Sequence, residues 1–314
     1  MIVVAACTYK RPDGLKRLLD SIAALDRPAD EECRVVIVDN DGDDPRVAAV
    51  AEAFGRESGW LIHLVVERAP GIAEARNAAF REARRLGART LAMIDDDEWV
   101  TPRWLTALIA TRDATGAKVV GGPVRPVFSK NRAHLARHAR FWSVERDFLA
   151  GRPFVFCTCN FLVEMEAVTF LGDEVFDRSF GLTGGSDTVF FRHLFARGVP
   201  MAWSEEAAIE EEIPDSRATI AWLRQRRYRF GQVARRWEQV VPVEGDLPPL
   251  VKTLAAIARL PFYPFMARER SSFWLAWLLE ADKVRGRIAA QLGSRYAEYG
   301  RPATKPLAKP DTSS

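Results

Sequence analysis

Short apolar runs alternate with longer amphipathic segments over residues 1–100 of the chain. Unbroken apolar runs are typical of strands that a parallel sheet buries on both faces, whereas apolar residues three and four apart indicate a helix. We therefore predict strands within residues 2–7, 35–38, 60–68 and 91–94. We predict helices within residues 15–25, 46–56 and 71–87. This alternation predicts an α/β fold with a mostly parallel sheet and right-handed crossovers.

Polar side chains follow three of the predicted strands. They are Thr8 and Tyr9 after the first strand, Asp39 after the second, and Asp95, Asp96 and Asp97 after the fourth. Because ligands bind at the carboxyl ends of the strands in open α/β sheets, we expect these groups to converge on one pocket. The chain has neither G-x-G-x-x-G after the first strand nor G-x-x-x-x-G-K-[ST], which disfavours Rossmann-type dinucleotide binding and P-loop chemistry.

Three consecutive carboxylates repel one another, so a fold keeps Asp95, Asp96 and Asp97 together only where positive charge compensates them. A hard divalent cation, Mn²⁺ or Mg²⁺, takes oxygen ligands of this kind and shares them with the phosphates of a substrate. Because side chains alternate along an extended strand, we expect Asp95 and Asp97 to point one way and Asp96 the other. A solvated acidic turn is the competing interpretation, and the triplet alone leaves both open.

The bulk composition narrows the classes of function and location. The chain has 314 residues, 48% hydrophobic and 28% charged, which suits two domains or one large α/β domain with an appendage. A net charge of only +3 argues against nucleic acid as the main partner. We expect neither a signal peptide nor a membrane span, since no basic segment precedes the first apolar run and no apolar run reaches about 18 residues. Four cysteines without disulfide-like spacing favour a reducing, cytoplasmic compartment.

Three patterns in the middle of the chain each allow two interpretations. Paired glycines at Gly122 allow close approach to a sugar ring or to another strand, or they mark a simple bulge. Two histidines four apart within residues 130–141 fit a metal site, but a solvated basic helix face is favoured. Cys157 and Cys159 would share one face of a strand, and a lone C-x-C is weak evidence for zinc.

Four motifs occur in a fixed order along the first half of the chain: A-C-T-Y-K-R-P, V-I-V-D-N, G-I-A-E-A-R-N-A-A and I-D-D-D-E. Together they resemble the family 2 glycosyltransferases with the GT-A fold, over about residues 1–230. The resemblance is to bacterial enzymes that build exopolysaccharides and cell-surface glycans. It implies a UDP-, GDP- or dTDP-sugar donor and a divalent cation, Mn²⁺ or Mg²⁺, as cofactor.

The resemblance also assigns roles to residues in these motifs. It implies nucleotide contacts at Thr8, Tyr9, Arg11, Asp39, Arg76, Asp95 and Asp96. Tyr9 would stack on the base, an interaction that contributes roughly 1–3 kcal/mol, and Asp39 would accept hydrogen bonds from the base edge. Asp97 would hold the metal. Without the aspartates, Tyr9 and Arg76 would be interpreted as a turn aromatic and a helix-surface cation.

Asp187 precedes an amphipathic helix, and locally it fits an N-cap or a first-turn acid at least as well as a catalytic group. The family places a Glu-Asp pair at this turn, and the Asp is the general base. Such a base contributes roughly 10²–10⁴-fold to the rate. This chain keeps Asp187 but has Ser186 where the Glu is usual, which puts the role of the neighbouring acid in doubt. Contacts with the acceptor or donor sugar are implied at Gly122, Asn160 and Ser186.

The last third of the chain is basic and then apolar. Arg227 and Arg229 lie in an arginine-rich helix that either binds the donor diphosphate or is simply solvated. Residues 248–299 form a helical appendage that lies in a membrane interface, or else packs on the catalytic domain or a partner subunit. We expect residues 301–314 to be disordered.

The sequence thus predicts a catalytic GT-A domain over residues 1–235, with a nucleotide-binding half at 1–100 and an acceptor half at 101–235. The predicted activity is inverting, metal-dependent transfer of a sugar from a nucleotide donor to a hydroxyl of a glycan or lipid-linked acceptor. The predicted place is the cytoplasm, peripherally at the inner face of the cell membrane. A sugar-nucleotide pyrophosphorylase and a non-catalytic nucleotide-binding scaffold of a polysaccharide synthase are the alternatives.

Overall fold

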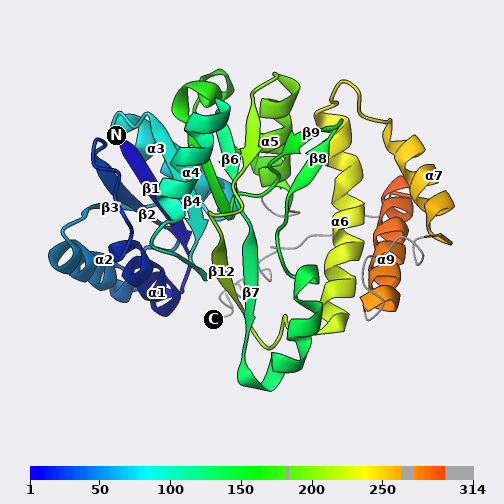
Figure 1. The fold of residues 1–314 in the computed structure, drawn as a ribbon, viewed down its shortest axis with the longest axis horizontal. Coiled ribbons are helices and arrows are strands. Elements are labelled where there is room, and N and C mark those ends of the chain that lie inside the picture. The colour runs from blue at the N-terminus through cyan, green and yellow to red at the C-terminus, as the bar shows by residue number, and fades with distance from the viewer. Residues whose placement is uncertain (181–183, 263–271, 294–314) are drawn as a thin grey trace, which may run out of the picture.

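The computed structural model describes residues 1–180, 184–262 and 272–293 (Figure 1). A seven-stranded sheet forms its centre, in the order β11-β6-β10-β4-β1-β2-β3. The strands are β1 (Ile2–Thr8), β2 (Cys33–Asp39), β3 (Leu61–Val66), β4 (Thr90–Asp95), β6 (Val119–Gly121), β10 (Asn160–Glu164) and β11 (Met201–Trp203). Only β10 runs antiparallel to its neighbours in this sheet, so the prediction of a mostly parallel α/β sheet is confirmed.

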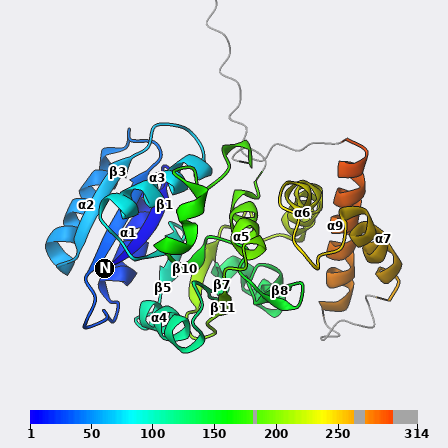
Figure 2. The same ribbon diagram turned by 90° about the horizontal axis from the view of Figure 1, so that it is seen from above.

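Helices cover both faces of the sheet, and Figure 2 shows α3 and α4 on opposite sides of it. The helices of this layered part are α1 (Pro12–Ala23), α2 (Pro45–Ser58), α3 (Ile72–Arg85), α4 (Trp104–Thr115) and α5 (Ser186–Ala196). The alternation along β1 feeds two separate cores: Val3 and Ala5 face the core with α3 and α5, while Ile2 and Val4 face the core with α1, α2 and α4. Full burial on both faces explains the unbroken apolar run at the start of the chain.

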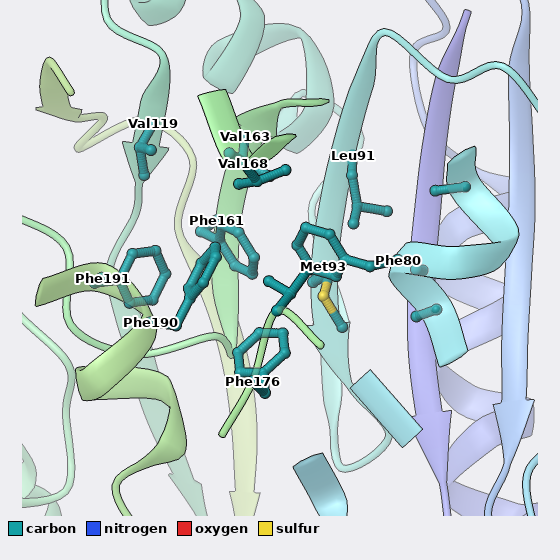
Figure 3. Close-up of a cluster of buried hydrophobic side chains, with 14 of the residues drawn as sticks. Phe80, Leu91, Met93, Val119, Phe161, Val163, Val168, Phe176, Phe190 and Phe191 are labelled. Atoms are coloured by element: carbon teal, nitrogen blue, oxygen red, sulfur yellow. The ribbon is translucent and has the colours of Figure 1, made fainter. Parts of the chain in front are cut away.

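The core on the α3 and α5 side is rich in phenylalanine (Figure 3). Phe80 of α3 packs edge-on against Phe176 and Phe190, with ring centroids 5.6 and 5.8 Å apart. Phe161 of β10 meets Phe191 of α5 at 5.1 Å. Each fully buried ring contributes roughly 1.5–3 kcal/mol, and edge-to-face contact adds to that. These contacts fix α5 on the sheet, with its first turn at the edge where the strands end.

Smaller elements extend this edge. A three-stranded sheet is formed by β5 (Glu98–Val100), β12 (Ile209–Ile213) and β7 (Val124–Phe128), and a hairpin by β8 (Asp147–Leu149) and β9 (Arg152–Phe154). The 3₁₀ segments are η1 (Lys130–Phe141), η2 (Met165–Leu171) and η3 (Arg178–Phe180). The prediction that Cys157 and Cys159 share a strand face is wrong, because both lie in the irregular segment between β9 and β10. Their Sγ atoms are nevertheless 3.1 Å apart.

The chain then adds α6 (Ile220–Val240), α7 (Pro249–Arg259) and α9 (Phe273–Gln291), which lie side by side at the end of the molecule opposite β3 (Figure 1). Gly231 of α6 and Gly286 of α9 lie at the crossing of these two helices, where an added Cβ would meet the backbone of the other helix. Buried Arg287 of α9 donates to Glu238 of α6 at 2.8 Å. The helix α9 therefore packs on α6, which begins within residues 1–235. No helix among the described residues is long and apolar enough to cross a membrane, and residues 301–314 lie outside them.

Candidate active site

Strand register brings the predicted polar groups together. Thr8 lies opposite Asp39 on the neighbouring β2, and Cys7 lies opposite Asp95 on β4. Three strands of one sheet therefore end at the same level, as expected for a ligand site at a carboxyl edge. The hydroxyl of Thr8 donates to Asp96 Oδ2 at 2.8 Å, which fastens the turn after β4 to the end of β1.

Arg11 joins two of the three consecutive aspartates. Its Nη1 lies 3.0 Å from Asp96 Oδ1 and 2.8 Å from Asp97 Oδ2. The expected alternation is wrong for these two residues, because Asp96 and Asp97 lie in the turn between β4 and β5 and both accept from one guanidinium. Burial raises the pKa of Asp96 to about 6, although Arg11 and the Thr8 hydroxyl oppose that shift. A second cation, Arg217, stands 3.8 Å from Asp97 Oδ2.

Asp95 is paired from the other side of the sheet edge. Arg76 of α3 is buried and lies 3.5 Å from Asp95 Oδ1, with its guanidinium 5.8 Å from the ring centroid of Phe176. Burial raises the pKa of Asp95; Arg76 lowers it, while the charges of Asp97 and Asp187 raise it further.

A second wall of the site is built by the end of β2 and by the first loop. Asp39 is buried and accepts from the Asp41 amide at 3.0 Å, while Tyr9 is 42% exposed with Lys10 over its ring at 5.2 Å. Asn40 was missed by the sequence analysis. Its side chain donates to the carbonyls of Glu67 and Ala69 at 2.8 and 2.7 Å and so holds the segment that leads to α3.

Two glutamates were also missed, because they come from the small sheet. Glu98 on β5 is buried and accepts from the Asp95 amide at 2.8 Å, and burial raises the pKa of Glu98 well above its usual range. Its register partner on β12 is Glu211. Burial and the nearby Asp97 raise the pKa of Glu211 to about 7. The segment I-E-E-E-I, which forms β12, has three consecutive glutamates and no alternation of apolar and polar residues, and its pairing partner is far away in the chain.

The donor set suits a hard cation that completes its shell with other ligands. Among the described residues no three His, Cys, Asp or Glu side chains are arranged as a ready metal cage. Mg²⁺ and similar ions are commonly held by one or two carboxylates together with water and substrate phosphates. Asp97 offers a carboxylate for such an ion, and the carboxyl groups of Asp95 and Glu211 are near enough to interact with it.

Comparison with known proteins agrees with this arrangement. The sequence profile described as Glycosyl transferase family 2 matches residues 3–170, which is more than half of the chain. The chain belongs to glycosyl transferase family 2. Over 231 residues it is 36% identical to the succinoglycan biosynthesis protein ExoM of Rhizobium meliloti (strain 1021), covering 74% of this chain and 73% of that protein.

Two further proteins are similar to this glycosyltransferase, one in sequence and one in fold. A glucosyl-dolichyl phosphate glucuronosyltransferase of Haloferax volcanii is 24% identical over 258 residues, which cover 78% of this chain and 80% of that protein. The solved structure of the mannosyltransferase PcManGT from Pyrobaculum calidifontis, in complex with GDP-Man and Mn²⁺, superposes with a TM-score of 0.59. The superposition covers 94% of this chain and 88% of the PcManGT chain at 18% sequence identity, so it supports the shared GT-A fold.

In this glycosyltransferase Asp187 is an acid of the first turn of α5, not its N-cap, which is Gly185. One carboxylate oxygen accepts from the Thr188 amide at 2.8 Å, which fixes the side chain at the helix start. Ser186 is buried beside it. An acid in the first turn interacts favourably with the helix dipole.

Two residues expected to contact a sugar are occupied by the protein itself. Asn160 is buried, donates to the carbonyls of Pro123 and Ala207 at 3.1 and 2.7 Å, and accepts from Trp104 at 2.8 Å. A Cβ at Gly122 would meet the backbone of Ala207. Close approach to another segment of the chain therefore accounts for Gly122, and hydrogen bonds within the protein account for Asn160.

Arginines just before α6 and along it lie at different places. Arg217 precedes α6 and stands near Asp97, and the charges of Arg226 and Arg217 both lower the pKa of Glu211. Arg226 and Arg227 line a cleft beside α7 and α9, and Arg229 is a half-buried residue further along α6. Diphosphate binding by Arg227 and Arg229 stays a prediction.

Proposed function

We propose that this glycosyltransferase transfers a sugar from a nucleotide-sugar donor to an acceptor hydroxyl with inversion, using a divalent cation and Asp187 as general base. One observation carries the proposal. Asp187 lies in the first turn of α5, which packs through Phe190 and Phe191 on β10, the neighbour of the strand that ends in Asp95, and the charge of Asp187 adds to the raised pKa of Asp95. A base must lie within reach of both the acceptor and the donor's anomeric carbon, and this placement supports such a position.

The nucleotide would bind at the ends of β1 and β2. The ring of Tyr9, 42% exposed, would stack on a base, and Asp39 stands at the strand end where a base edge would lie. Asp95 and Asp96 would contact ribose and diphosphate, and Asp97 would hold the cation. A bound Mn²⁺ or Mg²⁺ supplies positive charge to the departing diphosphate.

The protein's own cations complete the donor pocket. Arg11 and Arg217 neutralise Asp97 at 2.8 and 3.8 Å, and both guanidiniums lie where diphosphate oxygens would come close to that carboxylate. Arg76 holds Asp95 in place from the buried side. Asp187 would take the proton from an acceptor hydroxyl as the hydroxyl oxygen attacks the anomeric carbon from the face opposite the leaving nucleotide. A single displacement of this kind inverts that carbon.

The acceptor class is proposed from the relatives. ExoM is described as a succinoglycan biosynthesis protein, and the H. volcanii enzyme as one that acts on glucosyl-dolichyl phosphate. We propose a lipid-linked glycan acceptor in cell-surface polysaccharide assembly, with the enzyme peripheral on the inner face of the membrane. The PcManGT complex contains GDP-Man and Mn²⁺, so a nucleotide-sugar panel with Mn²⁺ is the natural starting assay.

The test is donor turnover across UDP-, GDP- and dTDP-sugars, with Mn²⁺ or Mg²⁺ and then with EDTA. Asp187→Asn is expected to lower kcat by roughly 10²–10⁴-fold while nucleotide binding persists. Asp97→Ala is expected to abolish turnover with either metal ion. The exposed Asp20→Asn on α1 serves as the matched control. Nucleotide binding without turnover on any acceptor, lipid-linked ones included, would favour a non-catalytic scaffold instead.

A further inference from the structure

A second cavity opens beside the candidate active site. It has a volume of about 680 Å³ and lies between the η1 and β8–β9 segments on one side and α6, α7 and α9 on the other. Phe156 and Thr188 also line it, so it reaches the first turn of α5. Thr188 is the chain neighbour of Asp187. A molecule in this cleft would therefore extend to the proposed base.

Positive charge dominates the lining of the cleft, where lysine and arginine side chains outnumber carboxylates. Arg192, Lys252 and Arg287 belong to a buried network with Asp246 and Glu238 and are neutralised there. Across the described ranges, the side chains with no carboxylate within salt-bridge distance include Arg140, Arg146 and Arg259.

Apolar groups surround these cations. Phe148, Phe230 and Trp237 form part of the wall, and the Arg146 guanidinium lies 4.8 Å from the ring centroid of Phe148. Cations over apolar walls suit a ligand that carries phosphate at one end and hydrocarbon next to it. A nucleotide would instead require hydrogen-bond donors and acceptors placed for a base edge, whereas cations and apolar side chains predominate in this lining.

The outward face of α7 continues this apolar surface. Leu250 and Leu254 are each 57% exposed, and Val251 and Ile257 are exposed beside them. The inward face is polar: Thr253 is buried and accepts from Arg287 at 3.0 Å. The helix thus buries its polar side and exposes its apolar side, the reverse of an ordinary surface helix. An amphipathic helix with basic neighbours of this kind is typical of a membrane interface.

We propose that this cleft binds the phosphate or diphosphate group of a membrane-anchored lipid acceptor, while the outward face of α7 lies in the membrane surface. The inference rests on the proposed function, since it names the site for the acceptor of that reaction. Arg146 and Arg259 bind the phosphate oxygens, the hydrocarbon leaves along α7, and the sugar end reaches Asp187. Charge complementarity favours this occupant, because Arg146 and Arg259 would face its phosphate and the exposed leucines of α7 would face its hydrocarbon.

The first experiment measures binding of a short-chain prenyl diphosphate, farnesyl diphosphate, by calorimetry in EDTA. The full-length protein is expected to bind it, and Arg146→Ala/Arg259→Ala to bind it at least about tenfold more weakly, because charge-assisted contacts to phosphate are lost. Arg56→Ala/Arg103→Ala, two exposed arginines on other elements, is the matched control and is expected to bind like the parent. Unchanged affinity in the cleft variant, or no binding by the parent, would overturn the inference.

Inorganic pyrophosphate in the same assay separates the two sources of phosphate. Weaker binding of pyrophosphate than of farnesyl diphosphate is expected, because pyrophosphate lacks the hydrocarbon. Equal affinity would assign the cleft to a free phosphate and overturn the lipid assignment. UDP and GDP binding with Mn²⁺ is measured on the same samples: a parent that binds farnesyl diphosphate but no nucleotide contradicts the proposed function and leaves the cleft assignment standing.

The second experiment tests α7 by co-sedimentation with phosphatidylcholine vesicles that carry a polyprenyl phosphate. Leu250→Gln/Leu254→Gln is expected to lose most vesicle binding. The control is Leu61→Gln/Leu64→Gln on β3, whose leucines are 56% and 37% exposed. Equal sedimentation of both variants and the parent would overturn the membrane assignment. So would a dimeric parent that the α7 variant alone converts to a monomer, since α7 would then contact a second copy of the chain.

Discussion

Glu211 is a half-buried carboxyl that the fold places near Asp97, and burial raises its pKa to about 7. Below about pH 4.5 both the folded and unfolded chains carry this proton. Between that pH and 7 only the folded chain keeps the proton, so the free energy of unfolding declines as the pH rises. Glu211→Gln removes this loss and is expected to raise the free energy of unfolding by about 1–2 kcal/mol at pH 8.

Urea unfolding in EDTA at pH 5 and pH 8 checks this prediction. The gain is expected at pH 8 and should be much smaller at pH 5, where the folded chain retains the proton. Glu205→Gln, at an exposed position, provides the control. An equal gain at both pH values would show that Glu211 acts through packing and that its ionisation is not the cause.

At this same scale, the sequence predicted residues that follow their strands directly. Thr8, Asp39 and the aspartate triplet meet at one edge because each is the next residue after a buried apolar run. Glu98 directly follows the triplet and accepts from the Asp95 amide three residues earlier. Glu211 and Arg217 could not be placed in this way, because they reach the acids through the pairing of β5 with β12, and no local pattern encodes a pairing between strands so far apart in the chain.

At the scale of elements, the crossing of α6 and α9 depends on two glycines. A Cβ at Gly231 would meet the Lys283 carbonyl, and the backbone on either side cannot move without separating the helices. Gly231→Ala is therefore expected to lower the free energy of unfolding by about 1–3 kcal/mol, despite the better helix propensity of alanine. Urea unfolding measures the loss, with Ala221→Ser at an exposed position of α6 as the control. A stabilised Gly231→Ala protein would contradict the close crossing.

Periodicity also explains which elements the sequence predicted. The four strands predicted within residues 1–100 and the helices α1 to α3 have strong local patterns, and each appears within a few residues of its predicted position. The segment around Cys157 and Cys159 alternates as a strand would, yet it has no strand to pair with and follows an irregular path into β10. The contact of α9 with α6 was one of two open interpretations, because an apolar stripe does not reveal what covers it.

At the scale of the whole molecule, the C-terminal helices stabilise the part of the chain that carries the candidate active site. Arg192 of α5 donates to the Val241 carbonyl at 2.8 Å and lies 3.3 Å from Asp246. Glu238 is buried against Arg287 of α9. A chain that ends after Gly245 would lose Asp246 and Arg287 together, which leaves one buried cation and one buried carboxylate without their partners. Removing one partner of a buried ion pair costs about 3–5 kcal/mol.

We therefore expect the full chain to unfold cooperatively and the chain truncated after Gly245 to lose this cooperativity. The truncated chain should also bind more of an apolar dye than the full chain does. The loosened part includes α5, which carries Asp187, so donor turnover should fall more steeply than nucleotide binding at the ends of β1 and β2. Urea unfolding, dye fluorescence and nucleotide titration on the two proteins test this together. If the truncated chain unfolds at the same urea concentration as the full chain, residues 1–235 are an independent domain. The buried pair between α6 and α9 would then serve only to hold the helices that carry the exposed face of α7.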